Sequence, residues 1–217
     1  DREGVQPTRS TKLWGEHLWL PRRGVAVHIN AFNFPAWGLA EKAAVAWLAG
    51  LPVITKPATS TALLAHRIVE ILIEKAILPA GALSLLCGSA GSLLDQLTEQ
   101  DVVAFTGGSD TAHLLRRHRA VVEGGVHHND EADSQIDVIL EPDGEASREI
   151  YDLFLNDVVK YITQKTGQKC TAVRRIFLPA ERYAAALAEL VDRLSGCRLG
   201  NPRDEATTMG PVATAAQ

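Results

Sequence analysis

The chain of 217 residues has little cysteine, no long apolar run and no large excess of either charge. Its three cysteines are too few and too unevenly spaced for a disulfide framework, and no C-x-x-C pair offers metal-ligand spacing. No apolar run reaches the roughly 18 residues of a membrane span, and the first residues show no signal-peptide pattern. A formal net charge of -4 gives no basic field for nucleic acid or a membrane surface. We therefore expect neither partner, and a reducing, cytoplasmic location.

Short apolar runs alternate with amphipathic stretches from about residue 23 onward. The predicted strands are 25–29, 53–55, 83–87, 102–105, 136–140 and 173–178. The predicted helices are 37–49, 93–97, 150–162 and 182–194, one opening at Ser109, and one with the apolar stripe Leu64, Ile68, Ile71 and Leu72. Such alternation predicts an α/β protein with parallel βαβ units in a doubly wound sheet, which binds ligands at the carboxyl ends of its strands.

The segment 121–135 is polar and interrupts this pattern. We interpret it as a crossing between two structural units, with a domain boundary near Ser134. The prediction is a first domain over residues 1–133 and a second over residues 134–217, within the size range of ordinary domains.

A single cysteine, Cys170, stands in the glycine-containing loop Gly167-Gln168-Lys169-Cys170-Thr171 before an apolar strand. It could be a covalent nucleophile, which needs a local positive potential or a nearby base to form the thiolate. The alternative is a small buried hydrophobic residue.

Two polar segments directly follow the first two predicted strands. Asn33, in the segment 30–35, could donate its amide to an oxygen that gains negative charge, or could form an Asx turn before a helix. Lys56, in the segment 56–59, could meet a ribose or phosphate, or could be an exposed lysine beside a turn proline.

Two further segments could carry chemistry. Residues 105–109 form a glycine turn that we place after the fourth strand, where backbone N–H groups could approach a cofactor, although a glycine turn alone is weak evidence. Glu131 is a candidate general base, with a solvated loop carboxylate as the alternative. The neighbouring pair His127-His128 suggests a metal site only weakly, and we expect none.

Together these segments resemble the aldehyde dehydrogenase superfamily, in the order of that family. The match rests on Asn-Phe-Pro at Asn33, Lys-Pro-Ala at Lys56, Phe-Thr-Gly at Phe105 and Gly-Gln-Lys-Cys at Cys170. Residues 28–35, 87–91 and 167–172 resemble one branch more closely. That branch is the dehydrogenase domain of the bacterial phenylacetate ring-opening protein, and its near relative is the 3,4-dehydroadipyl-CoA semialdehyde dehydrogenase of benzoate degradation.

The resemblance implies a Rossmann-like cofactor domain, the first part of a catalytic domain, and a catalytic trio. Cys170 would attack the aldehyde, the Asn33 amide and the Cys170 backbone N–H would hold the resulting oxyanion, and Glu131 would activate water. Glu123, in Glu123-Gly124-Gly125, imitates the superfamily's base motif, but spacing from Phe105 and from Cys170 favours Glu131. The implied substrate is a small aldehyde, possibly linked to CoA.

The resemblance also implies a nicotinamide cofactor. The implied cofactor-binding residues are Ile29, Asn30, Ala31, Phe32, Lys56, Ala58, Thr59, Gly88, Phe105, Thr106, Gly107 and Gly108. NAD-preferring relatives often carry a glutamate where this chain has Thr59, so NADP is expected, with NAD as the alternative. Gly108 stands where the family usually has serine.

Family members extend beyond both ends of this chain, so we expect it to be a fragment of a homo-oligomeric protein. Two other functions stay open: a non-catalytic fragment that at most binds nucleotide, and a dehydrogenase that passes its thioester to CoA.

Overall fold

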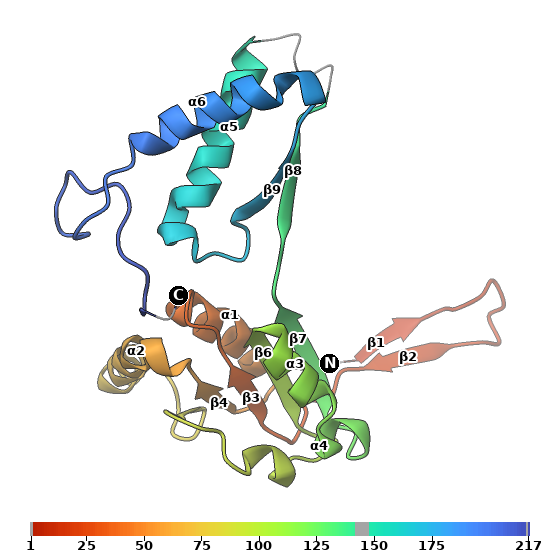
Figure 1. Cartoon of the computed structure of the whole chain (residues 1–217). Coiled ribbons are helices and arrows are strands. Elements are labelled where there is room, and N and C mark those ends of the chain that lie inside the picture. Colours follow the sequence, from red (N-terminus) through yellow and green to blue (C-terminus); the bar gives the residue numbers. More distant parts are fainter. Residues whose placement is uncertain (1, 142–147, 216) are drawn as a thin grey trace. The chain divides into compact units, whose positions relative to one another are not determined.

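Figure 1 shows the computed structural model, which describes residues 2–141, 148–215 and 217. The chain forms two compact units, Asp1–Ala132 and Asp133–Gln217. In the described parts, no helix is both long and apolar enough to cross a membrane.

The first unit is built on a parallel sheet of five strands in the order β5-β4-β3-β6-β7. The strands are β3 (Ala26–Ile29), β4 (Val53–Lys56), β5 (Leu83–Leu85), β6 (Val102–Gly107) and β7 (His127–Ala132). The chain steps outward from β3 to β5 and then returns to the other side of β3, so its direction reverses between β3 and β6. In doubly wound sheets the crevice at this reversal is the usual ligand site.

Helices cover both faces of this sheet (Figure 1). On one face α1 (Pro35–Leu48) packs its Ala43 and Ala46 against Ala26 and Val53, and α2 (Ala62–Glu74) packs beside it. The other face, which includes Val27 and Val103, packs against the 3-10 helix η2 (Leu93–Gln96), α3 (Ser109–Arg116) and α4 (Arg119–Val122). This division follows from the period of two in side-chain direction along a strand.

The first unit also contains an antiparallel hairpin of β1 (Arg2–Val5) and β2 (Gly15–Leu18). The sequence did not predict these strands, whose residues are mostly polar. A short 3-10 helix, η1 (Thr59–Thr61), leads into α2.

The second unit pairs β8 (Ile136–Ile139) with β9 (Val173–Phe177) in parallel. Both α5 (Arg148–Thr163) and α6 (Tyr183–Ser195) lie on one side of this pair (Figure 1). Their shared core is centred on Leu155 and Val158, packed with Ala186 and Leu190. The 3-10 helices η4 (Gln164–Gly167) and η5 (Ala180–Arg182) connect these elements.

The alternating parallel α/β pattern predicted from sequence is confirmed, but several local predictions are wrong. The helix predicted at 93–97 is present as a 3-10 helix over residues 93–96, but the strand predicted at 83–87 is shorter, because β5 ends at Leu85, before Cys87. The stripe predicted for the second helix is misplaced, because Ala65 and Val69 are buried while Leu64 and Ile71 are exposed. The small Ala65 lets α2 approach Leu39 of α1 closely.

The polar segment 121–135 is not a plain crossing, because it contains the edge strand β7. Its side chains alternate between exposed and half-buried, and its backbone pairs with β6 over six residues. Edge strands are often polar, because an exposed apolar edge would invite pairing with another chain. The apolar pattern used to predict strands is therefore missing here.

Candidate active site

Asn30 directly follows β3 at the reversal point and is nearly fully buried. Its backbone N–H donates to the Lys56 carbonyl at 3.0 Å, and its side-chain Nδ2 donates to Thr55 Oγ1 at 3.0 Å. Its Oδ1 has no hydrogen-bond partner among the described residues. A buried acceptor without a partner is costly unless a ligand or water satisfies it. Asn30 therefore both ties β3 to β4 and offers one acceptor at the edge of the sheet.

Ala31, Phe32 and Asn33 form the half-buried bend between β3 and α1. Pro35 occupies the first turn of α1, where its missing N–H costs nothing, and Gly38 N–H donates to the Phe34 carbonyl at 2.8 Å. The sequence predicted this strand-to-helix placement of Asn33. The bend is thus short and fixed at both ends.

Lys56, Ala58 and Thr59 follow the same edge at the end of β4. Lys56 is half-buried, with its Nζ 3.4 Å from the Pro57 carbonyl, whereas Thr59 is exposed at the start of η1. Lys56 is therefore not the fully exposed lysine of the second alternative. It is half-buried and remains available to meet a ribose or phosphate.

Gly88 follows β5 with a φ of +100°, a conformation that L side chains rarely adopt. A Cβ built there would meet nothing within 4 Å. The same is true of Gly108, which caps the N-terminus of α3 and is exposed. Open space therefore lies over two backbone segments at the carboxyl edge of the sheet.

Phe105, Thr106 and Gly107 all belong to β6, so the strand predicted over residues 102–105 extends by two residues into the turn that we placed after it. The Phe105 ring is buried against Ala112 and Leu115, and a Cβ at Gly107 would come within 2.6 Å of that ring. Thr106 Oγ1 is buried without a hydrogen-bond partner among the described residues. Gly107 is therefore required by packing, and Thr106 offers a second orphan polar atom near the edge.

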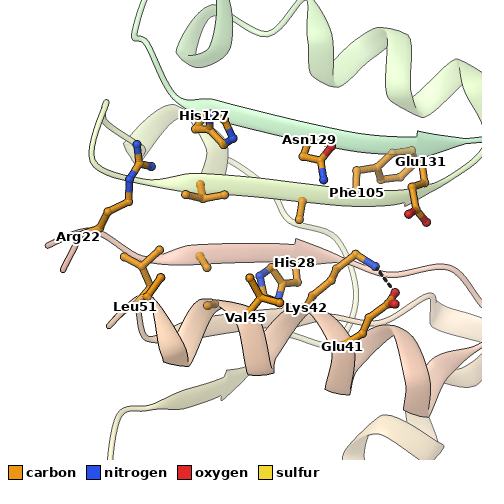
Figure 2. A pocket seen from close by; sticks show the side chains of 15 residues that line it. Arg22, His28, Glu41, Lys42, Val45, Leu51, Phe105, His127, Asn129 and Glu131 are labelled. Atoms are coloured by element: carbon orange, nitrogen blue, oxygen red, sulfur yellow. Dashed lines mark hydrogen bonds and ion pairs between the residues drawn. The ribbon is translucent and has the colours of Figure 1, made fainter. Parts of the chain in front are cut away.

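Glu131 lies near the end of β7, opposite Thr106 in the strand register. It lines a cavity of about 610 Å³ between α1 and the strands β6 and β7. Figure 2 shows Glu131 from β7 and Lys42 from α1 pointing into this cavity from opposite walls. Of the predicted site residues, only Glu131 and Phe105 line it. Asn33 and the segment 56–59 do not.

His28, in the middle of β3, faces the same cavity (Figure 2). Burial, and then the nearby charge of Lys42, lower the pKa of His28 to about 4. The imidazole is therefore neutral near pH 7, in a cavity that Lys42, Glu41 and Glu131 also line. Lys42 forms an ion pair with Glu41 at 3.3 Å.

Glu123, the alternative base considered from sequence, lies at the C-terminus of α4, before β7 begins. It is exposed and pairs with Arg119 at 2.9 Å. It is thus associated with the amino end of β7, whereas Glu131 is near the carboxyl end.

Cys170 belongs to the second unit and is exposed, so the alternative of a buried structural cysteine is wrong. It follows a turn in which Lys165, Thr166 and Gly167 all have φ between +53° and +69°. Glycine adopts this conformation freely, but Lys165 and Thr166 are strained in it and need outside support. That support comes from Arg174, which donates to the Gly167 carbonyl at 2.8 Å, and from Thr166, which donates to the Gly210 carbonyl at 3.0 Å.

Cationic side chains surround this turn. Desolvation lowers the pKa of Lys165, the Cys170 thiol acts on it in the opposite direction, and Lys169 lowers it further. The Lys169 Nζ itself donates to Gln164 Oε1 at 2.7 Å and lies 4.5 Å from the centroid of the Tyr161 ring. A positive potential at a cysteine favours the nucleophilic thiolate.

Sequence reasoning missed Lys42, His28 and Ser134. Lys42 shares the sheet-facing stripe of α1 with Leu39 and Ala46, and a charge on such a stripe was a usable signal. His28 likewise interrupts an apolar strand. Ser134 donates through its hydroxyl to the Cys170 carbonyl, and no local pattern in the sequence indicates that contact.

Comparison with known proteins identifies the family of this chain. Residues 7–217 match the aldehyde dehydrogenase family. The chain belongs to this family.

Among curated relatives of this aldehyde dehydrogenase chain is the 3,4-dehydroadipyl-CoA semialdehyde dehydrogenase of Aromatoleum evansii. It is 53% identical over 94% of this chain and 39% of its own length. The 1-pyrroline-5-carboxylate dehydrogenase of Anoxybacillus flavithermus is 32% identical over 87% of this chain and 37% of its own length. The resemblance that the motifs indicated, including the semialdehyde dehydrogenase branch, is therefore confirmed.

Among solved structures, betaine aldehyde dehydrogenase from Staphylococcus aureus in complex with NAD+ matches with a TM-score of 0.76 and 25% identity. The match covers 90% of this chain and 38% of that one. The chain thus spans about two fifths of the length of the relatives it matches.

Proposed function

We propose that the full-length protein oxidises an aldehyde to a carboxylic acid with Cys170 as the covalent nucleophile. The observation that carries this proposal is the exposed Cys170 in a supported, lysine-rich turn of an aldehyde dehydrogenase chain. The thiolate adds to the aldehyde carbon and gives a thiohemiacetal. Loss of hydride from that carbon leaves a thioester, and water releases the acid and restores the thiol.

Two residues assist Cys170 in this scheme. The Asn33 amide and the Cys170 backbone N–H donate to the oxygen that becomes negative when the thiolate adds. Glu131 takes a proton from the water that attacks the thioester. The Glu131 carboxylate is exposed to solvent within its cavity, which suits the supply of water.

We place the dinucleotide at the carboxyl edge of the sheet in the first unit, within a cofactor domain that we propose to cover residues 1–133. Asn30 Oδ1 and Thr106 Oγ1 are buried polar atoms that lack partners among the described residues, and open space lies over Gly88 and Gly108. The nicotinamide, when bound, accepts the hydride. Ile29, Ala31, Phe32, Phe105 and Gly107 would line its cleft, and Lys56 and Ala58 would hold the adenosine ribose.

The cofactor we propose is NADP. Thr59 places no carboxylate near Lys56, so a 2′-phosphate would meet the ammonium without an opposing negative charge. NAD stays the alternative, since the related betaine aldehyde dehydrogenase was solved with NAD+.

The substrate we propose is a CoA-linked semialdehyde from aromatic degradation, as the name of the relative from Aromatoleum evansii suggests. A reducing cytoplasm suits a mechanism that needs a free thiol at Cys170. Residues 134–217 would then be the start of the catalytic domain, in a protein that assembles as a homo-oligomer.

The test is aldehyde-dependent reduction of NADP and NAD by the full-length gene product. We expect Cys170→Ala to abolish turnover, while Cys197→Ala, another free cysteine in the same unit, keeps it. If Cys170→Ala retained the parental rate, the covalent mechanism would be wrong. A parent that binds NADP in equilibrium dialysis but oxidises no aldehyde would support the non-catalytic alternative, and turnover that requires free CoA would support the acylating one.

A further inference from the structure

The strand register of the second unit brings the segment after β7 beside the cysteine turn. Ile136 of β8 pairs with Val173 of β9 in parallel. The register shifts by one residue between Ile136 and Asp137, but the segments that lead into the two strands still enter them side by side. Ser134 and Cys170 therefore meet at the amino ends of two adjacent strands.

Within this geometry the Ser134 hydroxyl donates a hydrogen bond to the Cys170 backbone carbonyl. Other hydrogen bonds support the turn at its flanks: Thr166 contacts Gly210, Gly167 accepts from Arg174, and Gln168 Oε1 accepts from Ala213 N–H at 2.9 Å. The bond from Ser134 differs from these because it acts on the backbone of the cysteine itself.

We propose that Ser134 is a positioning residue for the Cys170 nucleophile. Holding the Cys170 carbonyl restricts the backbone rotation of that residue, and so limits the directions in which Sγ and the Cys170 N–H can point. A nucleophile and an oxyanion donor held in one orientation react faster than mobile ones. The inference rests on the proposed role of Cys170.

The test compares three single variants of the full-length protein. Ser134→Ala removes the hydroxyl and Ser134→Thr keeps one. Ser195→Ala is the matched control, because Ser195 Oγ also donates to a backbone carbonyl, that of Asp192, at 2.6 Å in the same unit. The measurements are kcat and KM for aldehyde oxidation, the melting temperature, and amide hydrogen exchange of the peptide covering residues 168–172.

We expect Ser134→Ala to lower kcat about five- to tenfold, the value of one ordinary hydrogen bond, with the KM for the cofactor unchanged. Hydrogen exchange over 168–172 should become faster in the same variant. Ser134→Thr should recover most of kcat and of the exchange protection, and Ser195→Ala should match the parent in both.

Parental kcat and parental exchange in Ser134→Ala would overturn the inference while leaving the proposed function intact. Equal losses of kcat and melting temperature in Ser134→Ala and Ser134→Thr would also overturn it, because they indicate a purely structural role. If the parent oxidises no aldehyde, the proposed function fails. Faster exchange in Ser134→Ala alone would still show that Ser134 restrains Cys170.

Discussion

The two units hold their candidate residues in different ways. In the first unit, Asn30, Lys56 and Thr106 lie at or next to the carboxyl ends of buried parallel strands, and the backbone ladder sets their positions. In the second unit, Cys170 lies before the amino end of β9 and just after a turn of left-handed residues that is held by side-chain hydrogen bonds. The rule that ligands gather at carboxyl ends thus describes the first unit only.

This difference predicts where substitutions act. Changes inside the first unit should alter global stability, because its polar groups are buried in the ladder. Changes around Cys170 should alter reactivity with little effect on stability, because the turn is exposed.

The largest effect expected on stability comes from His28. Its pKa is about 4 in the folded chain and 6.5 as an ordinary value, so the unfolded chain binds more protons between these pH values. The free energy of unfolding should therefore fall by up to about 3 kcal/mol as pH drops from about 6.5 to about 4. Urea denaturation at a series of pH values measures this change in the free energy of unfolding. His28→Leu should flatten this dependence.

Asp101 gives the next effect, at the amino edge of the same sheet. Its Oδ1 accepts from Val25 N–H at 2.7 Å, and its Oδ2 accepts from Thr98 N–H at 2.7 Å and from Thr98 Oγ1. Burial opposes ionisation, but the hydrogen bonds from Thr98 and Val25 outweigh it and hold the pKa of Asp101 below its usual value. The stability it contributes is present above pH 4 and is lost as pH falls through the lowered pKa.

We expect Asp101→Asn to lower the free energy of unfolding by about 2 kcal/mol at pH 7. Asp204→Asn is the control, because the Asp204 carboxylate accepts from Ala206 N–H in an exposed turn of the second unit. Denaturant melts of the two variants should differ by most of that amount. Equal losses of unfolding free energy in the two variants would contradict the expected difference between the buried sheet of the first unit and the exposed turns of the second.

A substitution at Lys165 tests the second unit, where we expect a change in reactivity with little change in stability. The charge of Lys165 interacts with Cys170. Because a cation beside a cysteine speeds its reaction with alkylating agents, Lys165→Gln should slow alkylation of Cys170 at pH 7 about three- to tenfold. Iodoacetamide labelling followed by peptide mass analysis measures the rate at this cysteine. Lys165→Arg should restore it, and Lys160→Gln, a lysine of α5 near Tyr161, should not change it. A large loss of melting temperature in Lys165→Gln alone would point to packing instead of charge.

Sequence could predict the first unit better than the second because the ladder leaves a periodic trace. The apolar runs at 25–29, 53–55 and 102–105 identified three strands, and the segments after them contain most of the candidate residues. The strand β7 was not predicted, because residues 127–131 have no apolar side chain. The partners of the cysteine turn were not predicted, because their contacts leave no local pattern in the sequence. Ser134 binds the Cys170 carbonyl and Arg174 binds the Gly167 carbonyl. The roles given to Asn33, Glu131 and Cys170 stay predictions until the variants are measured.

The smallest effect concerns backbone strain, which both units contain. In the first unit Ala76, just after α2, has a φ of +48°, and its N–H donates to the Ile73 carbonyl at 2.9 Å. Glycine is the residue preferred at such a helix end, because a Cβ is strained there. Ala76→Gly should therefore raise the free energy of unfolding by about 0.5–1 kcal/mol, after the entropy of glycine in the unfolded chain is subtracted.

The control is Ala80→Gly, at an exposed position without a positive φ, which should lower the free energy of unfolding by several tenths of a kcal/mol. Thermal melts of both variants decide the matter: if Ala76→Gly were as destabilising as Ala80→Gly, left-handed backbone in this chain would carry no strain. The run at Lys165–Gly167 would then need no support from Thr166 and Arg174, and only the bond from Ser134 would still distinguish the cysteine turn from an ordinary exposed loop.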